Sequence, residues 1–126
     1  MESKFNEEYK RIGESKLIEY YSKKGYKVFK NIVAKSKGKQ KVKGKSKNGG
    51  TPDFLVVKDN EKFYVEEKTD YGGLNNNQEE KIIELIKQGE RVLLAKYNSE
   101  KKVFRFYEMD VELGRKFIEE VKVEWK

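Results

Sequence analysis

Two short stretches on either side of Asp59-Asn60 constrain the fold of this chain more than any other feature. The first, Pro52 to Val57 (PDFLVV), is almost continuously apolar, which is typical of a strand buried on both faces. The second, Phe63 to Thr69, has strand length, and Asp59-Asn60 supplies turn-forming side chains between the two. We therefore predict a β-hairpin near the centre of a sheet.

Hydrophobic spacing and capping residues predict two helices. The first runs from about Asn6 to Lys24 and ends at Gly25. The second begins after Asn75 and runs to about Gln88, with Gln78 as the capping-box partner of Asn75.

The remaining elements are three strands and a last helix. Alternating or nearly continuous apolar residues predict strands at Tyr26 to Val33, Arg91 to Tyr97 and Val103 to Tyr107. Asp110 is expected to cap a C-terminal helix with four inward residues, which are Leu113, Phe117, Ile118 and Val121. The predicted order is α-β-β-β-α-β-β-α. It describes a single α/β domain over residues 1–126, a mixed sheet flanked by helices, with a flexible Lys-rich loop at residues 35–50.

The composition excludes several kinds of chemistry. The chain has no histidine and no cysteine, which rules out histidine bases, thiolate nucleophiles and disulfides. A metal ion would therefore be a hard cation with oxygen ligands. No apolar run approaches the roughly 20 residues of a membrane span, and MESKFNEEYK lacks the apolar stretch of a signal peptide. We expect an intracellular, soluble protein without a membrane partner.

The excess positive charge is concentrated in one segment. The net charge is +7, and Lys35 to Lys47 (KSKGKQKVKGKSK) holds seven lysines and no acid. These lysines are Lys35, Lys37, Lys39, Lys41, Lys43, Lys45 and Lys47. A cationic arm on an otherwise neutral body favours binding to a nucleic-acid backbone with little sequence preference. The alternative is a solvated loop without a function.

The hairpin also carries charges at one end. Asp53 opens its first strand, and Glu66 and Lys68 share one face of its second strand, whereas Glu67 points to the other face. Pairing across the turn brings Asp53 roughly opposite Glu66 to Lys68. Close carboxylates repel each other unless they share a cation, and Mg²⁺ binds one or two carboxylates together with water and phosphate oxygens.

These residues resemble the signature of the PD-(D/E)xK nuclease superfamily. Residues 49–94 are similar to its VRR-NUC branch, which has a Pro-Asp strand start, Glu-x-Lys, a glycine-containing loop and a glutamine on the next helix. Here these are Pro52-Asp53, Glu66-Glu67-Lys68, Gly72-Gly73 and Gln78. Residues 13–28, GESKLIEYYSKKGYKV, resemble the first helix and strand of archaeal Holliday-junction resolvases. The middle residue of Glu-x-Lys is usually apolar in the family, and here it is Glu67.

The resemblance implies a restriction-endonuclease-like fold and a role for each site residue. Asp53 and Glu66 would be metal ligands, together with the main-chain carbonyl of Glu67. Glu14 would be an outer or water-mediated ligand. Lys68 would orient the attacking water, and Gln78 would fix Lys68 or the phosphate.

Each residue also has a plain structural interpretation. Asp53 could start a strand, and Glu66 with Lys68 could be an exposed ion pair of little energy. Glu14 could be a solvated helix residue, and Gln78 a capping residue only. The side chains of Glu67 and Asp70 are expected to face solvent.

The sequence favours the first of three functions and leaves the other two as alternatives. The first is a Mg²⁺-dependent, structure-selective DNA endonuclease, with Mn²⁺ able to substitute, that acts on four-way junctions or related branched DNA as a homodimer. The second is a non-catalytic, basic nucleic-acid-binding module on a nuclease fold. The third is a restriction-type endonuclease for duplex DNA.

Overall fold

The computed structural model describes residues 2–30 and 52–123, with side chains from residue 12 onward. Two helices and six strands follow one another as α-β-β-β-α-β-β-β. They are α1 (Glu2–Lys23), β1 (Lys27–Lys30), β2 (Phe54–Lys58), β3 (Glu61–Thr69), α3 (Asn76–Lys87), β4 (Val92–Asn98), β5 (Val103–Met109) and β6 (Arg115–Lys122). The α/β class and the mixed sheet flanked by helices are confirmed.

The six strands form one sheet in the order of the chain, β1-β2-β3-β4-β5-β6. The predicted hairpin is present: β2 and β3 are antiparallel from Phe54 opposite Val65 to Lys58 opposite Glu61. Asp59 takes a positive φ of 50° in the turn, which aspartate tolerates better than most residues. β3 and β4 are parallel, with α3 as the crossover, and the other neighbours are antiparallel.

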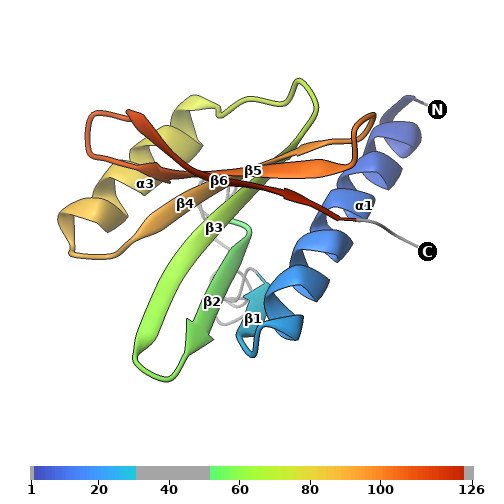
Figure 1. Ribbon diagram of the computed structural model, residues 1–126. Helices are drawn as coiled ribbons and strands as arrows, with labels where there is room; N and C mark the ends of the chain where they lie inside the picture. The colour runs from blue at the N-terminus through green and yellow to red at the C-terminus, as the bar shows by residue number, and fades with distance from the viewer. Residues whose placement is uncertain (1, 31–51, 124–126) are drawn as a thin grey trace, which may run out of the picture.

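Each face of the sheet packs against one helix, so that the site residues of β3 lie between two layers (Figure 1). We call these the α1 face and the α3 face. On the α1 face, Leu17 and Tyr21 of the helix pack on a cluster of sheet residues, which includes Phe54, Val65, Ala95, Phe104 and Phe106. On the α3 face, the helix residues Ile82 and Leu85 pack on Val92, Leu94 and Met109. Strand alternation distributes these residues between the faces.

The predicted C-terminal helix is wrong, because the segment forms strand β6 at the edge of the sheet. Asp110 closes a tight turn: its Oδ1 accepts hydrogen bonds from the backbone of Glu112 (2.9 Å) and Gly114 (2.8 Å). Arg115–Lys122 then pairs with β5, with a register irregularity that leaves Ile118 without a partner residue. A bulge of this kind, together with charged side chains, is how natural edge strands limit further pairing.

Two other features complete the outline. Within residues 2–30 and 52–123, no helix is long and apolar enough to cross a membrane. The predicted Lys-rich loop at residues 35–50 lies outside the described ranges.

The α1 face supports a test of the core. Phe106 is 2% exposed and stacks on Tyr20, with a ring-centroid distance of 5.3 Å, whereas Phe117 on β6 is 54% exposed. We expect Phe106→Ala to lower the free energy of unfolding by about 3–5 kcal/mol, because it removes a buried ring. Phe117→Ala, the matched control, should cost less than about 1 kcal/mol. Urea unfolding followed by circular dichroism measures both, and similar losses would contradict the assignment of the core.

Candidate active site

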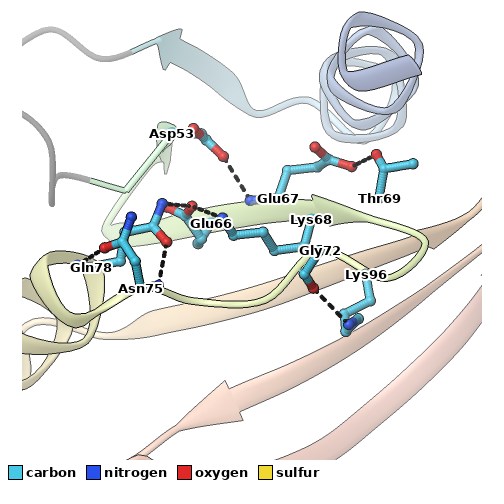
Figure 2. Close-up of polar contacts among 9 residues, drawn as sticks. All are labelled: Asp53, Glu66, Glu67, Lys68, Thr69, Gly72, Asn75, Gln78 and Lys96. Carbon is cyan, nitrogen blue, oxygen red and sulfur yellow. Dashed lines mark hydrogen bonds and ion pairs between the residues drawn. The ribbon is translucent and has the colours of Figure 1, made fainter. Parts of the chain in front are cut away.

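Strand β3 ends in charged and polar side chains that alternate between the two faces. Glu66 and Lys68 point to the α3 face, and Glu67 and Thr69 point to the α1 face (Figure 2). Both glutamates are almost fully buried, at 2% exposed for Glu66 and 1% for Glu67. Burying a carboxylate is costly unless it is hydrogen-bonded or paired with positive charge. Each face must therefore provide its own compensation.

On the α1 face, Glu67 lies in a cluster of three carboxylates. One oxygen each from Glu14, Asp53 and Glu67 lies within 4.8 Å of the other two. These residues come from α1, from the position before β2 and from β3. We call them the carboxylate cluster.

Several hydrogen bonds and one ion pair hold this cluster. The Glu67 backbone N–H donates to Asp53 Oδ2 (2.9 Å), and Thr69 Oγ1 donates to Glu67 Oε2 (2.7 Å). Glu14 Oε1 pairs with Lys30 Nζ of β1 at 3.1 Å. Nearby, burial raises the pKa of the Tyr97 hydroxyl, and the charges of Asp70 and Glu67 raise it further. The cluster is thus a region of negative potential, which favours a cation.

Gly13 allows α1 to approach the cluster closely. A Cβ atom at this position would lie 2.3 Å from Glu67 Oε2 and 2.7 Å from Thr69 Oγ1. Both distances are below any normal contact, so a larger side chain would force the Glu67 carboxylate to move. A glycine inside a helix otherwise costs about 1 kcal/mol relative to alanine. Glycine at position 13 leaves free the space that the Glu67 carboxylate occupies.

On the α3 face, Glu66 contacts Gln78 and Lys68. Glu66 Oε2 accepts a hydrogen bond from Gln78 Nε2 (2.8 Å) and lies 3.6 Å from Lys68 Nζ. Gln78 Oε1 accepts from the Asn75 backbone N–H (3.0 Å), and Asn75 Oδ1 accepts from the Gln78 N–H (2.8 Å). The capping box is confirmed, and the side-chain amide of Gln78 also binds Glu66. Its oxygen serves the helix cap and its nitrogen serves the site.

The structure groups Asp53 with Glu67, whereas the strand pattern predicted it beside Glu66. The expected register is present: with Phe54 opposite Val65, the next rung would set Asp53 opposite Glu66. Asp53 lies just outside β2, however, and its carboxylate turns to the backbone N–H of Glu67. Strand alternation could not reveal this turn, because it does not apply beyond the end of the strand.

Several plain interpretations do not hold. Glu67 is buried, and Glu14 is only 8% exposed, so neither is a solvated charge. Glu66 and Lys68 are not an exposed ion pair. Asp70 caps the turn after β4, since its Oδ1 and Oδ2 accept from the Ser99 backbone N–H (2.8 Å) and Oγ (2.7 Å). The seven lysines of residues 35–47 lie outside the part of the chain that the structure describes.

The carboxylate cluster has the donor set and the approximate size of a divalent-cation site. Oxygen ligands on opposite sides of Mg²⁺ lie about 4.2 Å apart, and those of Ca²⁺ up to about 5 Å apart. The three oxygens of the cluster lie within 4.8 Å of one another, and only one pair of three ligands can lie on opposite sides of an ion, so the carboxylates would draw closer together around a bound cation. The sequence pattern did not identify the Glu67 carboxylate, Gly13, Thr69 or Lys30. Glu67 as an unexpected charge inside Glu-x-Lys was the available signal.

The close approach at Gly13 can be tested through metal binding. We expect Gly13→Ala to leave the fold intact, because alanine favours the helix and the displaced atoms belong largely to a side chain. The same change should weaken Mn²⁺ binding about 10–100-fold by moving Glu67. Isothermal titration calorimetry measures the affinity, and circular dichroism measures the fold. Gly73→Ala is the control, since no atom lies within 4 Å of its added Cβ. Unchanged Mn²⁺ affinity in Gly13→Ala would contradict this role.

A comparison with known proteins agrees with this geometry. The sequence model of the VRR-NUC domain matches residues 2–98. These residues include α1, β1 to β4, the carboxylate cluster on the α1 face, and Glu66, Lys68 and Gln78 on the α3 face. No curated protein and no solved structure gives a significant match. The matched region is well over half of the chain. The chain therefore belongs to the VRR-NUC family of PD-(D/E)xK-like nuclease domains.

Proposed function

We propose that this protein is a divalent-metal-dependent DNA endonuclease that uses Mg²⁺ and accepts Mn²⁺. The carboxylate cluster of Glu14, Asp53 and Glu67, inside the region matched by a nuclease family, is the observation that carries the proposal. A divalent ion at this cluster would lower the pKa of a bound water and neutralise charge on the scissile phosphate.

Within this proposal, Glu67 supplies the side-chain ligand on β3. Asp53 is held by the Glu67 backbone N–H, so the two carboxylates keep a fixed relative position. Thr69 holds one oxygen of Glu67 and thereby orients the whole carboxylate group. Lys30 balances the charge of Glu14 and would move aside when a divalent ion binds, because its ammonium group is on an exposed side chain.

On the α3 face, Lys68 acts on the substrate, and Glu66 positions Lys68. The family resemblance gives Lys68 the role of orienting the attacking water, but with the ion at the cluster on the α1 face Lys68 would instead contact a phosphate oxygen of the substrate. The Glu66 carboxylate holds Lys68 from one side and is itself held by Gln78. Because Gln78 is fixed by the helix cap, the α3 N-terminus sets the position of this group.

We further propose that the substrate is a four-way junction or related branched DNA and that the protein acts as a homodimer. Two sites related by a two-fold axis would reach two strands of one junction. A junction and a linear duplex of the same arm sequences, incubated with the protein and Mg²⁺, compare the two substrates directly. Equal cleavage of both would favour a restriction-type enzyme instead. Analytical ultracentrifugation measures the oligomeric state.

The two glutamates can be distinguished by paired substitutions. We expect Glu67→Gln to reduce cleavage about 100-fold or more and to weaken Mn²⁺ binding, because it removes a ligand. Glu66→Gln should reduce cleavage about tenfold while Mn²⁺ binding is retained, because it loosens Lys68 and leaves the three carboxylates of the cluster in place. Cleavage of a labelled junction and calorimetric titration of Mn²⁺ provide the two readouts.

The reverse pattern, with metal binding abolished in Glu66→Gln only, would restore Glu66 as the ligand that the family resemblance implies. Asp53→Asn is the reference for an inactive site. Binding of DNA without cleavage by the wild-type protein in any divalent metal would indicate a non-catalytic binding module.

The lysines of residues 35–47 are proposed as a DNA-binding arm. Replacing all seven with glutamine should weaken binding of the junction, and should reduce the slope of log affinity against log salt by about 0.9 for each phosphate that the arm neutralises. Fluorescence anisotropy in EDTA measures this without cleavage. Mn²⁺ affinity should be unchanged, since the cluster is untouched. Unchanged DNA affinity would show that the segment is a solvated loop.

A further inference from the structure

A row of three basic residues, of which Lys68 is the first, crosses the α3 face. In the sheet register, Lys68 of β3 lies opposite Lys96 of β4, and Lys96 lies opposite Arg105 of β5. Residues opposite one another share a face, and neighbouring strands are about 4.8 Å apart, so the row spans roughly 10 Å. Like charges directly opposite one another on neighbouring strands destabilise a sheet. A row of this kind is therefore unfavourable for folding alone.

The charges of the two outer residues of the row, Lys68 and Arg105, are balanced by carboxylates, whereas Lys96 between them contacts a neutral group. Lys68 faces Glu66 at 3.6 Å, and Arg105 Nε binds Glu120 Oε1 at 2.7 Å. Lys96 Nζ instead donates to the backbone carbonyl of Gly72 (3.2 Å), which carries no net charge. Burial lowers the pKa of Lys96, and the charges of Arg115 and Lys68 lower it further. Among the three side chains of the row, Lys96 therefore has a neutral hydrogen-bond partner where the other two have carboxylates.

A cavity opens next to Lys96. Its volume is about 260 Å³, and Lys96, Lys101, Arg105 and Tyr107 contribute to its walls with two carboxylates, Asp70 and Glu120. Asp70 is occupied by the Ser99 backbone and hydroxyl, and Glu120 by Arg105. Among the residues that the structure describes, Lys101 Nζ forms no salt bridge. The cavity therefore presents cations whose charge is only partly balanced.

We propose that this cavity binds the sugar–phosphate backbone of the substrate strand, outside the catalytic centre. The inference rests on the proposed function, since it takes nucleic acid as the substrate. Phosphate oxygens would accept hydrogen bonds from Lys96 and Lys101, and Tyr107 would form a neutral wall for the sugar. Each strand of a DNA duplex carries one phosphate per roughly 3.4 Å of helix axis, so a row of roughly 10 Å corresponds to about three nucleotides of that strand. The row begins at Lys68, so the bound nucleotides would lie next to the phosphate that Lys68 contacts.

The test measures binding without cleavage. The full-length protein is titrated into a fluorescent single-stranded oligonucleotide in EDTA, over a series of salt concentrations. The double variant Lys96→Gln with Lys101→Gln should bind about tenfold more weakly. Its slope of log affinity against log salt should fall by about 0.7 for each phosphate that these lysines neutralise. The control is Lys116→Gln on β6, an exposed lysine opposite Glu108 on the α1 face, which should bind like the wild type.

A second variant keeps the test decisive if the double variant folds poorly. Glu120→Gln removes the carboxylate that pairs with Arg105. Because exposed ion pairs contribute little to stability, this variant should fold like the wild type. Its affinity for the oligonucleotide should rise about two- to fivefold, since Arg105 is then available to bind a phosphate. Wild-type affinity in both variants would overturn the proposal. The outcome does not depend on cleavage, so an inactive protein that still shows these effects would refute the proposed function and not this site.

A comparison of 5′-phosphorylated and 5′-hydroxyl oligonucleotides separates two sources of phosphate. An equal loss of affinity for both in the double variant indicates backbone binding, as proposed. A loss confined to the 5′-phosphorylated strand would overturn the proposal in favour of a pocket for a terminal phosphate.

Discussion

The burial of two adjacent carboxylates on one central strand is the constraint on which the rest of this structure depends. Glu66 and Glu67 point to opposite faces of β3, and water reaches neither side chain to any extent. The sheet therefore cannot be covered by purely apolar helices at this point. On one face α1 presents Gly13 and Glu14, and on the other α3 presents Gln78. Each helix contributes polar or minimal side chains next to Glu66 and Glu67, and apolar ones where it packs on the rest of the sheet.

The hairpin, the crossover helix and its cap were predictable from the sequence, because each is set by local signals. Asp59-Asn60 fixes a turn, and Asn75 with Gln78 fixes a helix start. Asp53, Glu14, Glu66, Lys68 and Gln78 were also predictable as candidates, whereas the Glu67 carboxylate was not. Their grouping was not, because Asp53 departs from strand geometry by one residue and selects the Glu67 side of the sheet. A side chain at the end of a strand is oriented by the backbone donor that it meets, which no pattern of alternation encodes.

The last element was mispredicted for a different reason. The spacing of Leu113, Phe117, Ile118 and Val121 fits a helix, yet Phe117 and Ile118 are exposed and the segment pairs with β5. The bulge at Ile118 shifts the alternation in the middle of the strand, so the apolar residues do not follow a period of two. Tertiary pairing outweighs local spacing here, as it often does for edge strands.

The order of the strands has a consequence for how the carboxylate cluster forms. Every strand pairs with the strand that follows it in the sequence, so each strand pairing joins elements that are consecutive among the strands of the sheet. Glu14, however, is carried by α1 and lies beside Asp53 and Glu67 because this helix packs on the sheet. The three carboxylates repel one another until a cation or Lys30 balances them, so docking of α1 is opposed by this charge. A divalent ion bound at the cluster would therefore stabilise the packing of α1 on the sheet.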